Sequence, residues 1–264
     1  MVTAIQSDDS NNVLIQGFKQ YFDIQRAKSP DILKEIYRIR YGVYCKEFGF
    51  DLPSHHGQER DEFDRYSSHC LLTHKTSGKK VGCIRVISLP ETANQIELPF
   101  ITHCAGSLYP DQLNPSTINS DDICEISRVA VVSEFRRRPG EQSSKDGLAG
   151  SLKTSNEDIE QTRRFPYIAP SLYLAAGALF LASHKKQIFV ATEPRLVKNL
   201  SMLGVRFKQI SELTDYHGQR AVYYFGRESI QEDINAMPSL LNGFFHYIKS
   251  PKGQLFELGN KCVC

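Results

Sequence analysis

The chain has 264 residues, of which 41% are hydrophobic and 23% charged, and its 32 basic and 30 acidic residues leave a net charge of +2. A chain of this length can bury a sizeable core without a disulfide or metal staple. The composition therefore excludes a wholly disordered protein and one whose entire surface binds nucleic acid.

The first half of the sequence predicts one helix followed by three strands. Ser29 and Pro30 are typical of a helix start, and apolar residues recur at helical spacing over 30–45. Residues 69–74 and 80–89 are short and rich in Val, Ile and Leu, and a turn at 76–78 joins them into a predicted hairpin. Residues 123–132 form the next predicted strand.

The second half alternates helices and strands. Pro166 and Pro194 open two predicted helices, over 166–185 and 194–204, with a strand at 187–192 between them. Residues 205–210 and 220–226 are expected to close the fold as an antiparallel pair. This order predicts an α/β (α+β) fold in which helices pack on a mixed, mostly antiparallel sheet.

Two segments stand apart from this pattern. Residues 133–165 are long and polar for a connection and are predicted to be a mobile insertion. Residues 227–264 hold enough apolar residues for one or two helices as a C-terminal extension. No internal repeat is present, so we expect a single domain over 1–264.

No feature of the sequence indicates export, a membrane span or a metal. Residues 1–12 are polar where a secretory signal needs an apolar core, and the apolar run 172–182 is too short to cross a bilayer. The seven cysteines are an odd number without C-x-x-C spacing. We therefore expect a cytoplasmic protein with no transmembrane segment, no bound metal and no nucleic-acid partner.

Charged residues lie where a core of strands and helices does not need them. Arg85 interrupts an apolar strand, and Glu125 and Arg128 lie inside another. Strand interiors bury charges only when these are paired. One interpretation is a buried ion-pair lattice that holds the first helix against the sheet; the other is a substrate site. Strand alternation places Arg128 on the opposite face from Glu125 unless a bulge intervenes.

Five motifs in register resemble the acyl-homoserine-lactone autoinducer synthases and the related N-acyl amino acid synthases of the GNAT-like acyltransferases. They are Arg40-x-x-Val43-Tyr44, Phe50, Glu59-x-Asp61-x-x-Asp64, Gly82-x-x-Arg85 and Glu125-x-Ser127-Arg128. Residues 37–45, 59–64 and 78–86 look like the acyltransferases associated with bacterial PEP-CTERM/exosortase systems. The resemblance spans about residues 30–225 and implies a GNAT-like fold with helices on both faces of the sheet.

The resemblance implies transfer of a fatty acyl group from a thioester to the amine of a small acceptor such as an amino acid. Autoinducer synthases usually carry Trp where Phe50 stands, which counts against S-adenosylmethionine as the acceptor and makes an autoinducer synthase the second interpretation. A catalytically silent module that binds acyl chains or carrier protein is the third. The phosphate-binding turn after Arg137 is incomplete, which favours an acyl carrier protein over acyl-CoA as the donor.

Roles follow from the resemblance. The catalytic residues are expected to be Glu125, as general base, with Asp61 and Arg85. The expected acceptor-binding residues are Arg40, Tyr44, Phe50, Glu59, Asp64 and Arg128. The backbone N–H groups of Val129, Ala130 and Val131 are expected to bind the thioester oxygen. Carrier protein or phosphopantetheine is expected to dock on the basic residues Arg136, Arg137 and Arg138. No cofactor is expected to be bound permanently.

Overall fold

A computed structural model describes residues 16–93, 96–136, 168–202, 204–236 and 239–249. Its centre is a mixed sheet of eight strands in the order β1-β4-β5-β6-β7-β10-β8, with β9 paired to β10. The strands are β1 (Phe22–Arg26), β4 (Ser67–His74), β5 (Lys80–Ile87), β6 (Ile123–Val131), β7 (Gln187–Thr192), β8 (Lys208–Gln209), β9 (Thr214–Asp215) and β10 (Gln219–Gly226). All neighbours run antiparallel except β6 and β7, which run parallel.

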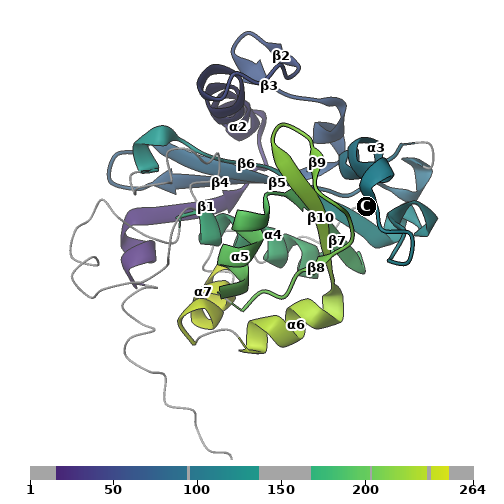
Figure 1. Ribbon diagram of the computed structural model, residues 1–264. Coiled ribbons are helices and arrows are strands. Elements are labelled where there is room, and N and C mark those ends of the chain that lie inside the picture. The colour runs from purple at the N-terminus through teal and green to yellow at the C-terminus, as the bar shows by residue number, and fades with distance from the viewer. Residues whose placement is uncertain (1–15, 94–95, 137–167, 203, 237–238, 250–264) are drawn as a thin grey trace, which may run out of the picture.

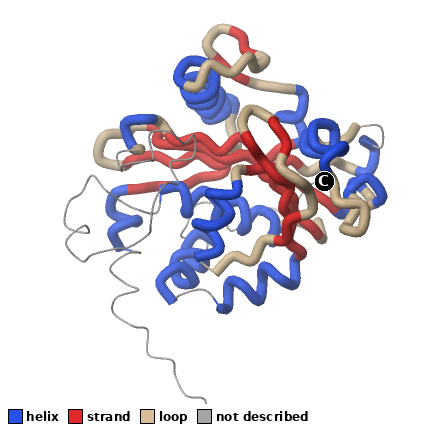
Figure 2. Tube along the Cα trace, in the orientation of Figure 1, coloured by secondary structure: helices blue, strands red, loops and turns tan. Residues whose placement is uncertain are grey.

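Helices cover both faces of this sheet, as expected from the resemblance (Figures 1 and 2). One face carries α2 (Pro30–Arg40) over β4, β5 and β6, and α3 (Pro99–Cys104) over β7 and β10. The other face carries α4 (Ile168–Ala182), on which α7 (Ser239–Lys249) packs. Two further helices of the described residues are α5 (Pro194–Met202) and α6 (Arg227–Ala236).

The first helix begins and ends in ways that position the site. The Ser29 hydroxyl accepts a hydrogen bond from the backbone N–H of Ile32 at 3.4 Å, and Pro30 supplies the first helical residue. After Arg40 the chain continues as a wider π-helix over Tyr41–Glu47, a feature often found at functional sites. This turn buries Tyr44 and leads to the small hairpin of β2 (Ser54–His55) and β3 (Gln58–Glu59).

A bulge in β6 resolves the question of side-chain direction. Cys83 pairs with Ala130 and Arg85 with Ser127, so two residues of β6, Arg128 and Val129, lie opposite the single residue Ile84 of β5. Arg128 occupies the bulge with a positive φ of 51°, a conformation uncommon for residues other than glycine. The bulge lets Arg128 reach Glu59 and Asp61 from the strand that also presents Glu125 and Ser127.

Strands β6 and β7 pair over only three residues each, from Ile123 to Glu125 and from Gln187 to Phe189. The later part of β6 therefore has no ladder partner on that side. Side chains of both strands line cavities in this region.

The predicted insertion at 133–165 lies largely outside the described residues, as do 250–264 of the C-terminal extension. The described part of that extension is helical, with α6 and α7. No helix in the described ranges is long and apolar enough to cross a membrane.

Candidate active site

The charged motifs converge on one cluster, which we call the ion-pair lattice. Its members are Arg40, Glu59, Asp61, Asp64, Arg85 and Arg128. They come from α2, β3, the turn after β3, β5 and β6. Three guanidinium groups face three carboxylates, so the formal charges balance within the cluster.

Arg40 holds the helix end of the ion-pair lattice. Its side chain is 0% exposed, its Nε donates to Glu59, and its Nη1 lies 2.6 Å from Asp64 Oδ1. Buried ions are tolerated when every donor finds a partner. The end of α2 is therefore fixed to the segment that follows β3.

Arg85 and Arg128 hold the sheet end. Arg85 donates to Asp61 at 2.6 Å and to Asp64 at 2.9 Å, and its Nε donates to the Ser127 hydroxyl at 2.9 Å. Arg128 donates to Glu59 at 3.1 Å and to Asp61 at 3.0 Å. Each sheet arginine therefore binds two of the carboxylates.

The geometry agrees with the first interpretation of the charges, a lattice between the first helix and the sheet. A polar cleft lies beside the ion-pair lattice. Of the six lattice residues only Arg128 also lines this cleft, and its side chain is 16% exposed. Direct contact of Arg40, Glu59, Asp61 or Asp64 with an acceptor stays a prediction, as do the catalytic roles of Asp61 and Arg85.

Burial and charge shift the pKa values of groups in and beside the ion-pair lattice. Burial alone would raise the pKa of Asp64, but Arg40 and Arg85 outweigh it and hold that pKa well below its ordinary value. His69 is 2% exposed, with Nε2 3.6 Å from Asp64. Burial, aided by Arg40 and Arg85, lowers the pKa of His69 to about 4.

These shifts predict a loss of stability in acid in two stages. An unfolded chain protonates His69 near pH 6.5 but the folded chain only near pH 4, so this contribution is lost as the pH falls between those values. Because the pKa of Asp64 is lowered from 3.8, its contribution is kept above that pH and lost below it. Urea unfolding of His69→Gln should show a flatter decline between pH 6.5 and 4, by about 3 kcal/mol at most. The exposed His55→Gln serves as control, and equal slopes in both variants would contradict the assignment.

Glu125 lies beside the ion-pair lattice but makes no ion pair with any described residue. Its side chain is 3% exposed, and its Oε2 accepts a hydrogen bond from the backbone N–H of Phe100 at 3.1 Å. Burial raises the pKa of Glu125 to about 7, against the lowering effects of Phe100 N–H, Arg85 and Arg128. A carboxylate whose pKa lies near neutrality is suited to general base catalysis.

Glu125 lines a polar cleft. Most of the residues that line the cleft come from the π-helix and the loop after it, from β6, from β7 and from the β9–β10 hairpin. Its lining includes Tyr44, Phe50, Glu125, Ile126, Arg128, Val129, Tyr173, Val190, Thr192, Glu193, Tyr216, His217 and Arg220.

One wall of the cleft is aromatic. Phe50 stacks on Tyr44 with ring centroids 6.3 Å apart and on His217 with centroids 4.8 Å apart. These contacts join the N-terminal segment to the β9–β10 hairpin, and Tyr216 lies next to His217 in the same wall. Such a wall can stack a planar ring or face a cation.

Tyr44 also fixes the bulged strand. Its hydroxyl donates to the Val129 carbonyl oxygen at 2.6 Å, and burial raises the pKa of Tyr44. Val129 itself lines the cleft directly after the bulge, and Ala130 and Val131 continue the strand. Their backbone N–H groups as a thioester oxygen site remain a prediction.

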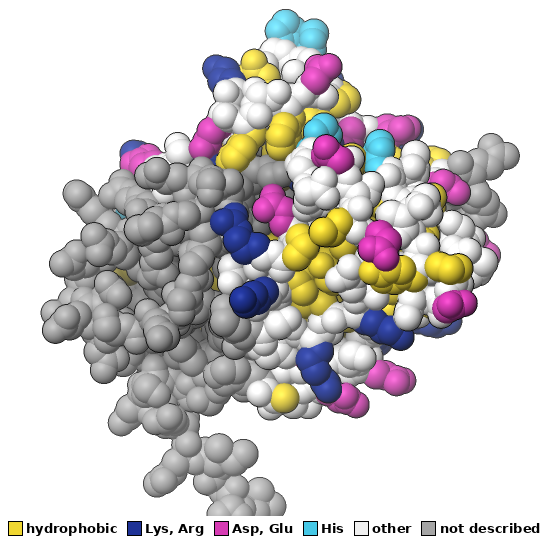
Figure 3. Space-filling model, viewed as in Figure 1, with side chains coloured by type: hydrophobic (Ala, Val, Ile, Leu, Met, Phe, Trp, Pro, Cys, Tyr) yellow, Lys and Arg dark blue, Asp and Glu magenta, His cyan; other side chains and the backbone are white. Residues whose placement is uncertain are grey.

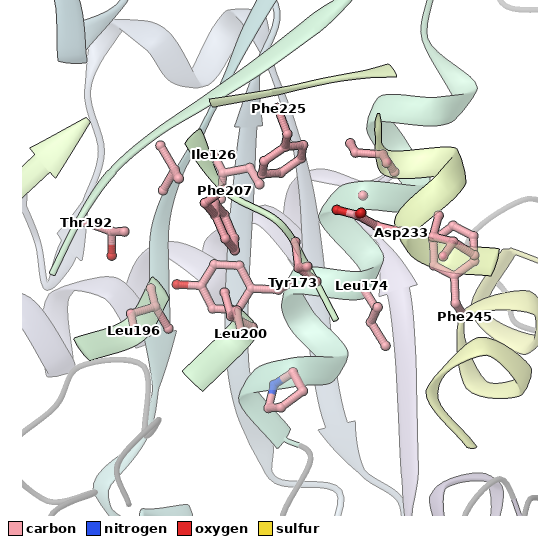
Figure 4. Close-up of a pocket in the computed structure, with 16 residues that line it drawn as sticks. Ile126, Tyr173, Leu174, Thr192, Leu196, Leu200, Phe207, Phe225, Asp233 and Phe245 are labelled. Atoms are coloured by element: carbon pink, nitrogen blue, oxygen red, sulfur yellow. The ribbon is translucent and has the colours of Figure 1, made fainter. Parts of the chain in front are cut away.

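A second, apolar cavity adjoins the cleft. The two share Ile126, Tyr173, Val190 and Thr192 as lining residues. In Figure 4, Tyr173 crosses the cavity between Thr192 and Leu196 on one side and Phe245 on the other. The cavity lies on the α4 face of the sheet, where Gly177, α6 and α7 complete its lining.

The basic surface predicted at 136–138 needs a correction. Arg136 is 0% exposed, pairs with Glu47, and donates from Nε to the Val131 carbonyl at 2.9 Å. It therefore lies inside the fold rather than on a docking surface. Arg137 and Arg138 fall outside the described residues. On the face seen in Figure 3, Lys and Arg side chains are interspersed with acidic ones.

Among the residues that the structure describes, no cysteine has the lowered pKa of a nucleophilic thiol. Burial raises the pKa of the Cys124 thiol far above its ordinary value and that of Cys104 to about 11, whereas nucleophilic thiols have lowered pKa values. In the part of the chain that the structure describes, no three His, Cys, Asp or Glu side chains are grouped to hold a metal.

Sequence reasoning missed much of the cleft. All five of the following residues line it, although Tyr173 and Arg220 were expected only as parts of a helix and a strand and the others lie between predicted elements: Tyr173, Glu193, Tyr216, His217 and Arg220. The one sequence signal among them is Arg220, a charge at the start of an otherwise apolar strand.

Comparison with known proteins agrees with this architecture. Residues 39–144 match the family model of the acetyltransferase (GNAT) domain. An acyl-homoserine-lactone synthase of Aeromonas hydrophila is 34% identical over 112 residues, which cover 42% of this chain and 48% of that protein. The chain thus spans about half the length of this relative.

Two solved structures share the fold at low identity. A CoA-dependent acyl-homoserine lactone synthase, BjaI, determined with SAM and isopentyl-CoA, superimposes with a TM-score of 0.53 at 17% identity, over 83% of this chain and 92% of that one. FeeM, an N-acyl amino acid synthase from uncultured soil microbes, gives 0.51 at 14% identity, over 83% and 96%. The chain therefore has the GNAT-like acyltransferase fold, as expected from its sequence motifs.

Proposed function

We propose that this chain transfers a fatty acyl group from a thioester to the amine of a small acceptor, with S-adenosylmethionine as the first acceptor to test. The observation that carries the proposal is the position of Glu125. This buried carboxylate, whose pKa is about 7, lines a polar cleft that adjoins an apolar cavity. The acceptor fits the cleft, the acyl tail fits the cavity, and the thioester lies at their junction.

The chemistry asks mainly for positioning and a modest base. The amine nitrogen attacks the thioester carbonyl carbon, the C–N bond forms and the C–S bond breaks. Glu125 accepts the proton that the nitrogen loses, and the departing thiolate takes up a proton. Since an α-amino group has a pKa of about 8, a base with a pKa near 7 suffices. Holding the two reactants together supplies several kcal/mol more.

The similar proteins favour S-adenosylmethionine over an amino acid as the first acceptor to test. Taken alone, Phe50, which stands where autoinducer synthases usually carry Trp, favours an amino acid as the first acceptor and S-adenosylmethionine as the second. The sequence match reported above is to an acyl-homoserine-lactone synthase, whereas the N-acyl amino acid synthase matches in fold alone. The aromatic wall of Tyr44, Phe50 and Tyr216 suits a purine and a sulfonium. An unmodified amino acid remains the second candidate.

Mass spectrometry of the products tests the proposal. Purified protein is incubated with long-chain acyl carrier protein or acyl-CoA, and with S-adenosylmethionine or an amino-acid panel. An acyl-homoserine lactone from S-adenosylmethionine supports the first acceptor, and an N-acyl amino acid supports the second. Tight donor binding without any product would contradict the enzyme and favour a binding module.

The donor and the cellular context are further parts of the proposal. An acyl carrier protein remains the first donor to test because the phosphate-binding turn is incomplete, with acyl-CoA as the alternative. The association with PEP-CTERM/exosortase systems rests on the sequence resemblance and stays a prediction, as does a cytoplasmic location.

Filling the apolar cavity should shorten the preferred acyl chain. Gly177 lines this cavity, and a Cβ built on it meets Phe245 at 4.0 Å, an ordinary contact. Gly177→Leu should therefore lower kcat/KM for long-chain donors at least about tenfold while sparing short-chain donors. Gly177→Ala is the control, since one methyl group fits without displacing Phe245. An unchanged chain-length profile in the leucine variant would place the acyl tail elsewhere.

A further inference from the structure

Arg220 stands at the edge of the polar cleft, outside the ion-pair lattice. It is the second residue of β10, where Arg220 pairs with Thr214 of β9 and the next residue, Ala221, with Thr192 of β7. Its side chain lines the polar cleft together with Tyr44 and Glu125, and it does not line the apolar cavity. The acceptor side of the site therefore carries a second guanidinium group besides Arg128.

The donors of Arg220 are poorly used. Nη1 reaches the Ala191 carbonyl at 3.5 Å and Nη2 the His217 carbonyl at 3.4 Å, both at the outer limit for a hydrogen bond. Nε is buried and has no hydrogen-bond partner among the described residues. No carboxylate of the described chain lies within ion-pair distance of Arg220, whereas Arg40, Arg85 and Arg128 each bind two.

A guanidinium with a buried, unused donor is costly unless an anion completes it. Its planar fork matches a carboxylate through two parallel hydrogen bonds. The Tyr216 ring lies 5.5 Å from the guanidinium carbon and limits its movement. The site is thus held ready for an anion on the acceptor side of the cleft.

We infer that Arg220 binds the carboxylate of the acceptor and so selects α-amino acids and their derivatives over plain amines. This inference rests on the proposed function and assigns a specificity-determining residue to it. Glu125 at the strand junction faces the amine, while Arg220 on the hairpin faces the other end of the acceptor.

Paired acceptors that differ only in the carboxylate test the inference. S-adenosylmethionine is compared with its decarboxylated form, and phenylalanine with phenethylamine. Wild-type protein should prefer the acceptor that carries the carboxylate in each pair. Arg220→Gln should lower kcat/KM for that acceptor about 100-fold, mainly by raising KM. The rate with the decarboxylated partner should not change. Arg220→Lys should recover part of the loss, because it restores the charge without the fork.

Calorimetric titration of the acceptors, without any acyl donor, gives a readout independent of turnover. Arg220→Gln should weaken binding of S-adenosylmethionine and leave its decarboxylated form unaffected. Arg26→Gln, an exposed arginine bound to Ser68 at the far edge of the sheet, is the matched control. Melting temperatures show whether Arg220→Gln or Arg26→Gln is unfolded. If Arg220→Gln is unfolded, the same acceptor titrations are carried out with Arg220→Lys.

Three outcomes would overturn the inference. Equal losses with both members of a pair would make Arg220 merely structural. A raised KM for acyl carrier protein, with unchanged acceptor binding and no effect when an N-acetylcysteamine thioester replaces the carrier, would make it a phosphate ligand. Absence of acceptor binding by wild-type protein would also refute it. By contrast, carboxylate binding that depends on Arg220 without acyl transfer would refute only the proposed function.

Discussion

Replacing Glu125 with glutamine is expected to lower kcat by about 10²- to 10⁴-fold, the usual contribution of a general base. The amide keeps the size of the side chain and an oxygen that can accept from Phe100 N–H, so the fold should persist. Since the pKa of Glu125 is about 7, wild-type kcat at saturating acceptor should rise with pH and level off above that value. The variant should lose this rising limb, which a pH series of initial rates will show.

Glu134→Gln is the control, because Glu134 is an exposed carboxylate on the surface that pairs with Lys79. Its rates and pH profile should match those of the wild type. If Glu125→Gln retains full activity, or keeps the rising limb near pH 7, another group is the base and the proposed mechanism fails.

Removal of Arg40 should have the largest effect on stability. Arg40→Ala leaves Glu59 and Asp64 as buried carboxylates without their helix partner, and breaking a buried pair in this way costs about 3–5 kcal/mol. Urea unfolding at pH 7 should show this loss as a lower midpoint. Activity should fall as well, because the turn that carries Tyr44 follows Arg40 directly.

Arg38→Ala provides a matched comparison on the same helix. Arg38 is 58% exposed and pairs with the neighbouring Glu35, so its loss should cost less than about 0.5 kcal/mol. Similar losses in the two variants would show that the ion-pair lattice does not hold α2 to the sheet.

The elements that could be predicted are those whose signals are local. The start of α2 follows from the Ser29 side chain and Pro30, and β7 coincides with the predicted strand 187–192 because an apolar run lies between clear breakers. By contrast, β1 has only five residues, and α3 only six without a side-chain cap, so neither stands out from a loop.

The candidate site could be predicted in membership but not in pairing. Motif spacing named all six residues of the ion-pair lattice, yet which arginine binds which carboxylate depends on the bulge at Arg128, a cross-strand feature. Arg136 was misplaced because a run of arginines usually marks a solvated surface. Arg220 was missed because a single charge at a strand end is common, and what sets it apart is a buried unused donor on an arginine without a carboxylate partner among the described residues.

The wall shared by the cleft and the cavity has a consequence for engineering. Four residues line both the polar cleft and the apolar cavity: Ile126, Tyr173, Val190 and Thr192. A substitution at any of them is therefore expected to change the specificity for the acyl chain and for the acceptor together. Leu200 and Phe245 line the apolar cavity but not the polar cleft, whereas His217 lines the polar cleft but not the apolar cavity. To change the specificity for the acyl chain or for the acceptor separately, substitutions are therefore best made at residues that line only one of the two spaces, with the four shared residues kept.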